Sequence, residues 1–274
     1  MQPAPGQFSQ LTTLQLQRIC AAPWGSALLE NITFTLEHGS ILALAGPNGA
    51  GKSSLLQFIS GDIPATTGQA IFRNRSLSDW SSQERARHMA FLPQMSLLNF
   101  PYTVEEVVML GRTPHSSGHQ VDLAIVEEAL RLTDTSALRH RLYTRLSVGE
   151  KQRTQVARVF AQICGEQSLH GQLLLLDEPT SALDLAHQQQ VLEAVRHLAN
   201  RGCSVVLVIH DVNLAASIAD RILVLDGGRA AALGRPQEVF TAVLFKAVFG
   251  VDVTISHHPL EGYPMIIPRR GAAP

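Results

Sequence analysis

A glycine-rich turn between an apolar strand and an apolar helix narrows the possible folds more than any other stretch of the sequence. Residues 46–53 read Gly-Pro-Asn-Gly-Ala-Gly-Lys-Ser and fit the pattern G-x-x-x-x-G-K-[ST]. Residues 41–45 before the turn predict a buried strand, and the apolar residues after it predict a helix that ends near Gly61. This order of strand, turn and helix is the context in which the pattern binds a nucleoside triphosphate.

The residue types in the turn suit phosphate binding. Glycines let the backbone curl so that N–H groups point at phosphate oxygens, and the following helix adds the positive end of its dipole. Lys52 supplies a positive charge for the β- and γ-phosphates, Ser53 an oxygen for Mg²⁺, and Ser54 a donor to the α-phosphate. The residues predicted to hold the nucleotide are Gly46, Pro47, Asn48, Gly49, Ala50, Gly51, Lys52, Ser53 and Ser54.

Two carboxylates follow a second apolar strand. Residues 173–176 are leucines, and Asp177 and Glu178 come directly after them. In open α/β sheets ligands bind at the carboxyl ends of the strands, so we expect both side chains beside the phosphates. Asp177 is predicted to hold Mg²⁺, directly or through water, and Glu178 to take a proton from an attacking water.

Two further polar residues lie near expected strand ends. His210 follows the apolar residues 205–209, so it is predicted at the same edge of the sheet, where it would contact the γ-phosphate. Gln94 lies where the strand-rich part of the chain passes into helices. A glutamine can ligate Mg²⁺ or orient water, but read alone Gln94 favours the simpler interpretation of an ordinary loop residue.

The start of another expected helix also has two interpretations. Ser147 and Glu150 form the capping box S-x-x-E, in which each side chain satisfies a backbone N–H of the first turn. Gly149 within that turn lowers helix stability, and helix N-termini are sites where anions bind. The segment is either a well-capped helix and nothing more, or an anion site formed by Ser147 and Gly149.

Strand and helix patterns alternate along most of the chain. Strands are predicted at residues 14–19, 32–36, 41–45, 173–176, 205–209 and 222–225. Helical spacing at 121–132, together with two S/T-x-x-E capping boxes, predicts a block of helices over about 95–171. We therefore expect an α/β fold with a mostly parallel sheet, an antiparallel β part and an inserted helical subdomain.

Composition excludes several classes of protein. A net charge of −1 over 274 residues gives no general attraction to nucleic acid or anionic lipid. Three widely spaced cysteines form neither a disulfide framework nor a zinc pattern and predict buried free thiols in a reducing compartment. The N-terminus has no signal-peptide pattern, and the apolar runs are shorter than the ~20 residues of a membrane span. We expect a soluble chain that meets a membrane only through a partner.

Together and in this order, the motifs resemble those of ATP-binding-cassette (ABC) ATPases, the nucleotide-binding subunits of ABC transporters. The resemblance covers about residues 12–250. It matches residues 46–54 to Walker A, Gln94 to the Q-loop, 146–150 to the signature motif, 173–179 to Walker B, 181–184 to the D-loop, and His210 to the switch histidine.

The resemblance implies a homodimer in which two subunits hold two ATP molecules between them, with Mg²⁺. The signature helix of one subunit would cap the ATP held by the other, so Ser147 and Gly149 would contact the partner's γ-phosphate. Implied catalytic residues are Glu178, His210 and Gln94, and implied Mg²⁺ ligands are Ser53, Gln94 and Asp177.

The same resemblance implies a domain division. Residues 1–11 form a loose N-terminus and 251–274 a C-terminal extension of the one domain. The ATPase domain spans 12–250, with its P-loop core at 12–94 and 172–230 and its helical subdomain at 95–171. The role of residues 231–274 stays open.

Two departures from the family pattern matter. The usual signature LSGGQ is LSVGE here, and we expect the Val148 side chain to point away from phosphate while Glu150 keeps the capping box. Adenine stacking has two candidates, Trp24 and Arg18.

Three stretches, residues 100–112, 173–190 and 257–268, are most similar to the haem (hemin) import subunits within the iron-siderophore, cobalamin and haem import group. This resemblance implies an ATPase at the cytoplasmic face of the bacterial inner membrane, held by a polytopic permease dimer and served indirectly by a periplasmic substrate-binding protein, with no nucleic acid. The alternatives are a siderophore or cobalamin importer and a soluble, non-transport ABC ATPase. His257 and His258 are expected to be surface residues with no haem-ligand role.

Overall fold

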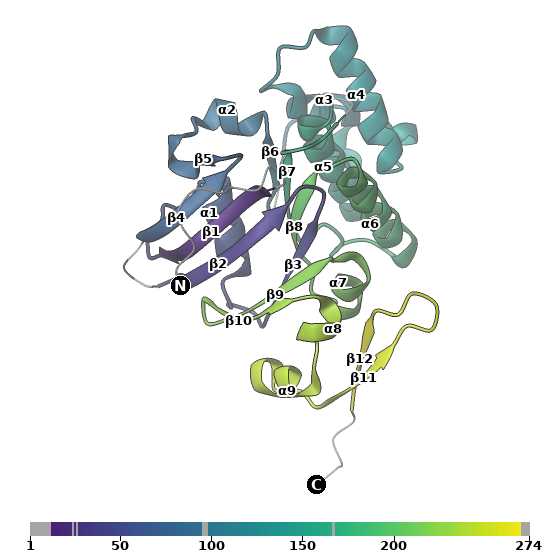
Figure 1. Cartoon of the computed structure of the whole chain (residues 1–274). Helices are drawn as coiled ribbons and strands as arrows, with labels where there is room; N and C mark the ends of the chain where they lie inside the picture. The colour runs from purple at the N-terminus through teal and green to yellow at the C-terminus, as the bar shows by residue number, and fades with distance from the viewer. Residues whose placement is uncertain (1–11, 24, 26, 95–97, 166–167, 270–274) are drawn as a thin grey trace.

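The centre of the molecule is a six-stranded sheet (Figure 1). The computed structural model describes residues 12–23, 25, 27–94, 98–165 and 168–269. Strand order is β10-β9-β3-β8-β7-β6, and all pairs are parallel except the edge pair β9–β10. The strands are β3 (Ile41–Ala45), β6 (Met89–Leu92), β7 (Leu173–Asp177), β8 (Ser204–Val208), β9 (Arg221–Asp226) and β10 (Arg229–Gly234). The predicted mostly parallel sheet is confirmed.

Both faces of this sheet are buried, which explains its uninterrupted apolar strands. In β7, Leu174 and Leu176 pack into the core on the side of α5 (Val148–Ile163) and α6 (Leu185–Asn200). Leu173 and Leu175 pack on the opposite side, against α1 (Lys52–Ser60) and the antiparallel sheet. Because its leucines are held on both faces, β7 fixes the position of the carboxylates at its end.

A four-stranded antiparallel sheet covers α1 and the second face of the core. Its strand order is β2-β1-β4-β5. The strands are β1 (Thr12–Ala21), β2 (Leu29–Glu37), β4 (Thr67–Phe72) and β5 (Arg75–Ser76), followed by η1 (Leu77–Asp79) and α2 (Ser82–Ala86). The backbone N–H of Glu30 donates to the carbonyl of Gly228 at 2.8 Å. This bond brings β2 to the β9–β10 turn, beside the glycine-rich turn.

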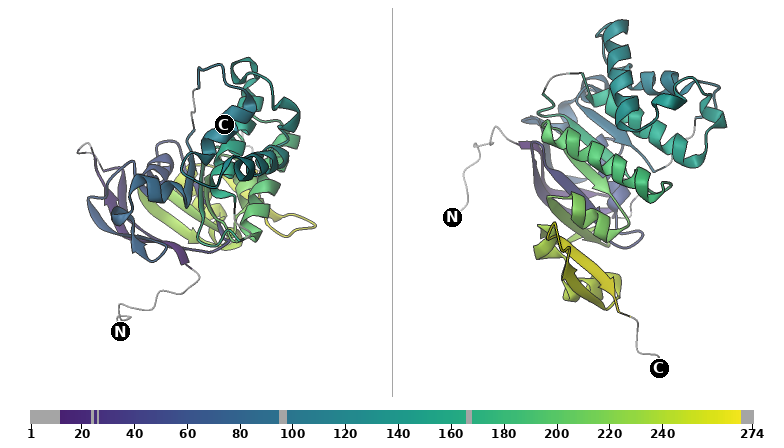
Figure 2. Two further views of the ribbon diagram at one scale, coloured as in Figure 1. Left: turned by 90° about the horizontal axis from the view of Figure 1, so that it is seen from above. Right: turned by 90° about the vertical axis from the view of Figure 1, so that its right-hand side faces the viewer.

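The expected helical block is present at one end of the sheet (Figures 1 and 2). Its elements are α3 (Val104–Met109), η2 (Leu110–Arg112), α4 (His119–Leu132), η3 (Ser136–Leu138), η4 (Tyr143–Arg145) and α5. The buried guanidinium of Arg112 joins three of them. It donates to Asp122 at 2.8 Å and to the carbonyls of Ala161 and Cys164 at 2.7 Å each.

The C-terminal part lies at the other end of the molecule, where Figure 2 shows it in yellow-green to yellow. Helix α7 (Val212–Ile218) precedes the last two strands of the main sheet. The elements that follow are α8 (Pro236–Val239), α9 (Ala242–Leu244), a π-helical turn η5 (Phe245–Phe249), and a hairpin of β11 (Val253–His257) and β12 (Pro264–Pro268). The sequence pattern predicted none of these four elements.

Three sequence predictions concern single features. Cys164 and Cys203 are buried free thiols as expected, but Cys20 is partly exposed, so the prediction was wrong there: its strand lies in the outer antiparallel sheet. His257 ends β11 at the surface. Among the residues that the structure describes, no helix combines the length and apolarity needed to cross a membrane.

Candidate nucleotide-binding site

The glycine-rich turn joins β3 to α1, and glycine is required at its bends. Gly46, Gly49 and Gly51 have φ angles of 143°, 77° and 99°, a region that other residues rarely adopt. A Cβ atom on Gly46 would also lie 2.1 Å from the carbonyl oxygen of Leu225 in β9. The turn therefore packs tightly on the sheet and leads into the N-terminus of α1, where backbone N–H groups bind phosphate.

Lys52, the first residue of α1, lies over the turn. Its Nζ donates to the carbonyls of Gly46 and Pro47 at 2.8 Å each, and the side chain is buried. Burial lowers the pKa of the Lys52 ammonium, while the nearby carboxylates of Glu178 and Asp177 act in the opposite direction. A buried positive charge at this point favours an anionic ligand.

Asp177 is the last residue of β7, and one of its two carboxylate oxygens lacks a hydrogen-bond partner among the described residues. This atom, Oδ1, is buried. Burial raises the pKa of the carboxyl, the hydroxyl of Ser53 opposes the rise, and the Glu178 carboxylate adds to it. Since an unpaired buried carboxylate oxygen is unfavourable, this atom calls for a cation or a donor from a ligand.

Glu178 has a strained backbone. Its φ angle is 53°, unusual for a residue with a side chain. The N–H of Glu178 donates to the carbonyl of Val208 at 3.1 Å. Its carbonyl accepts from Nε2 of Gln152 at 3.3 Å and from the hydroxyl of Ser181 at 3.2 Å, and these bonds hold the strained conformation. Strain of this kind collects at functional sites, and here it directs the chain away from the sheet just after Asp177.

The side chain of Glu178 binds two of the predicted residues. Gln94 Nε2 donates to Oε1 at 2.9 Å, and His210 Nε2 lies 2.6 Å from the same oxygen. When Glu178 is ionised its carboxylate can only accept, so in that state Nε2 of His210 is the donor of this contact. His210 therefore lies at the edge of the sheet where the strand-end argument places it, and Gln94 lies beside it at the Glu178 carboxylate.

These groups surround one cleft of about 770 Å³. Its lining residues are Ala27, Leu28, Asn48, Gly49, Ala50, Gly51, Lys52, Ser53, Ser54, Gln94, Glu178, His210, Gly227 and Gly228. Sequence reasoning missed Ala27, Leu28, Gly227 and Gly228. The glycine pair signals a turn, but its place in the cleft depends on the pairing of β9 with β3, which no local pattern reveals.

The two candidates for adenine stacking stay untested. Trp24 lies outside the described residues. Arg18 is an exposed residue of β1 with a φ angle of 49°.

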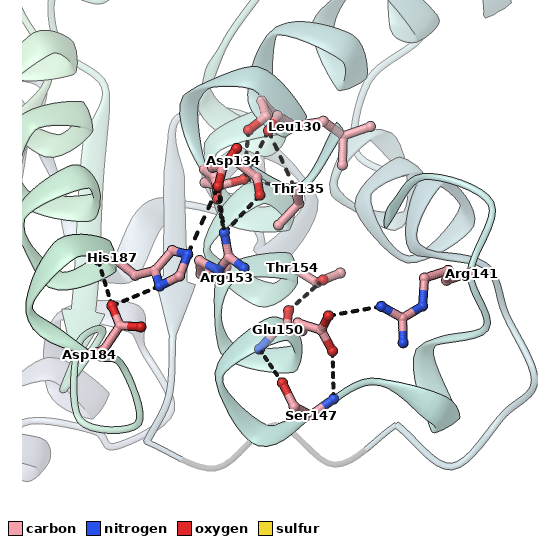
Figure 3. Close-up of polar contacts among 12 residues, drawn as sticks. Leu130, Asp134, Thr135, Arg141, Ser147, Glu150, Arg153, Thr154, Asp184 and His187 are labelled. Carbon is pink, nitrogen blue, oxygen red and sulfur yellow. Dashed lines mark hydrogen bonds and ion pairs between the residues drawn. The ribbon is translucent and has the colours of Figure 1, made fainter. Parts of the chain in front are cut away.

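The capping box at the start of α5 is confirmed (Figure 3). Ser147 Oγ accepts from the N–H of Glu150 at 3.3 Å, and Glu150 accepts from the N–H of Ser147 at 2.8 Å. This backbone donor lowers the pKa of Glu150, and Arg141 pairs with the same carboxylate at 2.9 Å. Val148, the first residue of the helix, is 73% exposed.

The start of α5 packs against residues 181–184 of the same chain. A Cβ atom on Gly149 would lie 3.1 Å from the carbonyl oxygen of Ala182, so the glycine allows a close approach. Figure 3 also shows a polar chain between α5 and α6. Arg153 pairs with Asp134 at 3.2 Å, and His187 lies 3.9 Å from that carboxylate and 2.8 Å from Asp184.

The predicted site residues therefore fall into two groups. The first lies around the cleft at the carboxyl ends of β3, β7 and β8, although Gly46, Pro47 and Asp177 are not among the residues that line it. The second, Ser147 and Gly149, lies at the start of α5, and among the described residues neither lines the cleft. Ser147 and its neighbour Val148 face solvent in the single chain. One chain thus carries a phosphate cradle and, separately, an exposed helix N-terminus.

Comparisons with known proteins agree with this geometry. The family model for ABC transporters matches residues 29–181. The hemin import ATP-binding protein HmuV of Pseudomonas entomophila is 50% identical over 244 residues, which cover 89% of this chain and 95% of the relative. The protein of the same name from Pseudomonas aeruginosa is 45% identical over 256 residues, with 93% and 100% coverage, and that of Gloeobacter violaceus is 44% identical over 251 residues, with 91% of each covered.

Solved structures show the same fold. An inward-facing structure described as an ABC transporter of metal-chelate type has a TM-score of 0.77 and 27% identity, covering 94% of this chain and 98% of that one. The ADP conformation of an ATP-binding cassette has a TM-score of 0.74 at 20% identity, with 88% and 98% coverage.

Proposed function

Since the chain belongs to the ABC transporter family, we propose that it is the ATP-hydrolysing subunit of a bacterial haem importer. The observation that carries the choice of cargo is the similarity to hemin import ATP-binding proteins, at 44–50% identity over about nine-tenths of the chain. The observation that carries the chemistry is the position of Glu178 in a cleft shared with Lys52 and the glycine-rich turn.

In this proposal ATP lies with its phosphates on the glycine-rich turn. Backbone N–H groups of the turn and the N-terminus of α1 hold the phosphate oxygens, and Lys52 leaves its two carbonyl partners to pair with the β- and γ-phosphates. Gly227 and Gly228 leave room at the wall of the cleft. The adenine ring would stack on Arg18 or on Trp24.

The residues present fit Mg²⁺. Asp177 offers a buried oxygen with no partner in the described part of the chain, and Ser53 and Gln94 add the neutral oxygens that this hard cation accepts. When bound, Mg²⁺ would neutralise negative charge on the phosphates. The proposed ligands are Ser53, Gln94 and Asp177.

Glu178 is the proposed general base for the attacking water. His210 and Gln94 both hold its Oε1, which leaves Oε2 to accept the proton. His210 Nε2, the donor to ionised Glu178, can turn to the γ-phosphate when ATP is bound. The protein's contribution is positioning and charge neutralisation, as in other phosphoryl transfers.

A second copy of the chain would complete each site. The exposed N-terminus of α5, with Ser147 and the small Gly149, would cap the γ-phosphate held by the partner. Two such subunits would then enclose two ATP molecules. Val148, as the exposed first residue of that helix, would point away from the phosphate.

The partner in the membrane is a permease, which the helical block between Gln94 and Ser147 would face. The subunit would be held at the cytoplasmic face of the inner membrane, and a periplasmic binding protein would deliver the cargo. The metal-chelate description of one structural neighbour favours siderophore or cobalamin import as the second candidate.

Haem uptake into proteoliposomes tests the proposal. The subunit is reconstituted with its permease, ATP is enclosed on the side of the subunit, and the haem-loaded binding protein is added outside. We expect haem to accumulate with ATP and a Glu178→Gln transporter to accumulate none. Accumulation of a ferric siderophore or cobalamin with no haem uptake would select the second candidate.

A further inference from the structure

The C-terminal hairpin is a firm unit built by its own contacts. The ring of His258 stacks on that of Tyr263 with centroids 4.7 Å apart, and its backbone N–H donates to the carbonyl of Tyr263 at 2.8 Å. At the open end, Arg269 Nε donates to the hydroxyl of Thr254 at 2.8 Å. The hairpin is therefore closed at its tip and at its base, and His258 has a structural role at the tip.

The side-chain amide of Asn213, in α7, binds both backbone groups of one hairpin residue, as a neighbouring strand would. Asn213 Oδ1 accepts from the backbone N–H of Ile266 at 2.7 Å, and Asn213 Nδ2 donates to the carbonyl of the same residue at 3.2 Å. The side chains of Ile266 and Val253 are buried in the main core beside this contact. A two-point amide clamp on a buried backbone fixes both the distance and the direction between α7 and β12.

Helix α7 begins immediately after His210. Asp211 is its N-cap and accepts from the N–H groups of Asn213 at 2.8 Å and Leu214 at 3.2 Å. The position of the first turn of α7 therefore sets the backbone of His210.

We propose that Asn213 is a positioning residue: by clamping the C-terminal hairpin to the first turn of α7, it holds the His210 side chain against Glu178. The proposal rests on the proposed function, because His210 matters only if it serves ATP hydrolysis. It assigns a purpose to the C-terminal hairpin that the cleft itself does not reveal. In this structure His210 Nε2 lies 2.6 Å from Glu178 Oε1, the position from which it would turn to the γ-phosphate, and a small rotation of α7 would move it away from that position.

The test is a double-mutant cycle on ATP hydrolysis by the full chain in complex with its permease. Asn213→Ala is expected to lower kcat about tenfold and to leave the KM for ATP within about twofold, since misplacement of a catalytic group affects the chemical step. In a His210→Ala background the same change is expected to leave the residual rate unaltered. Exposed Asn200, at the end of α6, supplies the control Asn200→Ala, which is expected to behave as wild type.

Each outcome decides the proposal. A kcat of Asn213→Ala within twofold of wild type would overturn it, and so would an equal loss in both backgrounds, which indicates general destabilisation. If Asn213→Ala does not fold, Asn213→Asp replaces it: it keeps the acceptor for the Ile266 N–H, loses the donor, and is expected to show the same dependence on His210. Full activity of His210→Ala itself would instead remove the premise taken from the proposed function.

Discussion

Three residues of the site adopt conformations or charge states that lower the free energy of unfolding, and the rest of the fold compensates for this cost. Glu178 has positive φ, Asp177 has a buried oxygen with no partner among the described residues, and Lys52 is a buried cation. Each feature destabilises the free chain and would be relieved by, or used in, the proposed binding of Mg²⁺ and ATP. Two predictions follow at this scale from the two adjacent carboxylates.

The first concerns Glu178. Glu178→Gln is close in shape and keeps an acceptor for His210, but it cannot take a proton from water. We expect the rate of ATP hydrolysis to fall by about 10²–10⁴-fold, the usual effect of losing a general base, with ATP affinity retained. Phosphate release and nucleotide binding are measured on the same preparation. Turnover near that of wild type would remove Glu178 from the role of base.

The second concerns Asp177 and pH. Burial raises its pKa above the reference value of 3.8, so the folded chain holds this proton more tightly than the unfolded chain. The ionised group therefore destabilises the fold at neutral pH, and this penalty develops as the pH rises from about 3.8 through the raised pKa.

Asp177→Asn is expected to raise the free energy of unfolding of the nucleotide-free chain by about 1 kcal/mol at neutral pH and to abolish Mg²⁺-dependent ATP binding. Urea titrations near pH 7 and near pH 4.5 check the sign, because the gain should shrink at the lower pH. A variant less stable than wild type at neutral pH would show that the ionised Asp177 does not destabilise the fold.

Among the elements, two helix starts have the same local structure and different surroundings. Helices α3 and α5 both begin with a capping box, and the cap bond from the N–H of Glu106 to Thr103 and that from Glu150 to Ser147 are both 3.3 Å long. Thr103 lies in the helical block and does not line the cleft, whereas Ser147 is proposed to contact the partner's nucleotide. Comparing Thr103 with Ser147 therefore distinguishes the effect of losing a helix cap from the effect of losing a functional hydroxyl.

We predict that Thr103→Ala and Ser147→Ala each lower the free energy of unfolding by about 1 kcal/mol, the usual loss of a helix cap. Only Ser147→Ala is expected to lower ATP hydrolysis, because only that hydroxyl is proposed to contact the γ-phosphate. Denaturant unfolding and ATPase assays are compared for both variants. Equal ATPase rates in the Thr103→Ala and Ser147→Ala variants would show that Ser147 serves only as a helix cap.

Local patterns predicted the elements whose signals are complete within a few residues. The turn with Gly46 and Lys52, the leucine strand before Asp177, and both capping boxes are of this kind. In each of them the local backbone geometry or burial requires particular residue types, so the local sequence is sufficient to predict the structure.

Features that depend on contacts between distant segments were not predictable. The strained φ of Glu178 is held by Val208 and Gln152, and the clamp of Asn213 needs Ile266, 53 residues later. Residues 251–256 alternate apolar and polar side chains, but the hairpin that carries Ile266 is also held by stacking and by core burial, which the alternation does not reveal. These arrangements are set by tertiary structure, which a local pattern does not encode.

On the scale of the whole molecule, the chain carries two functional surfaces that do not meet within one copy. The cleft holds the triphosphate-binding turn and Glu178, while the N-terminus of α5 is exposed elsewhere. In the proposed head-to-tail pair each surface would meet its complement on the other copy, and closed twofold symmetry would then give two sites at once. Hydrolysis that requires both copies is the central claim.

Mixing two inactive variants tests this claim most directly. Lys52→Ala removes the phosphate-binding cation and Ser147→Arg blocks the helix end, so neither variant alone has an intact site. Equal amounts assembled on the permease give mixed pairs in half of the complexes, each with one intact site, and should recover about a quarter of the wild-type ATPase rate. A mixture as inactive as either variant alone would contradict the account.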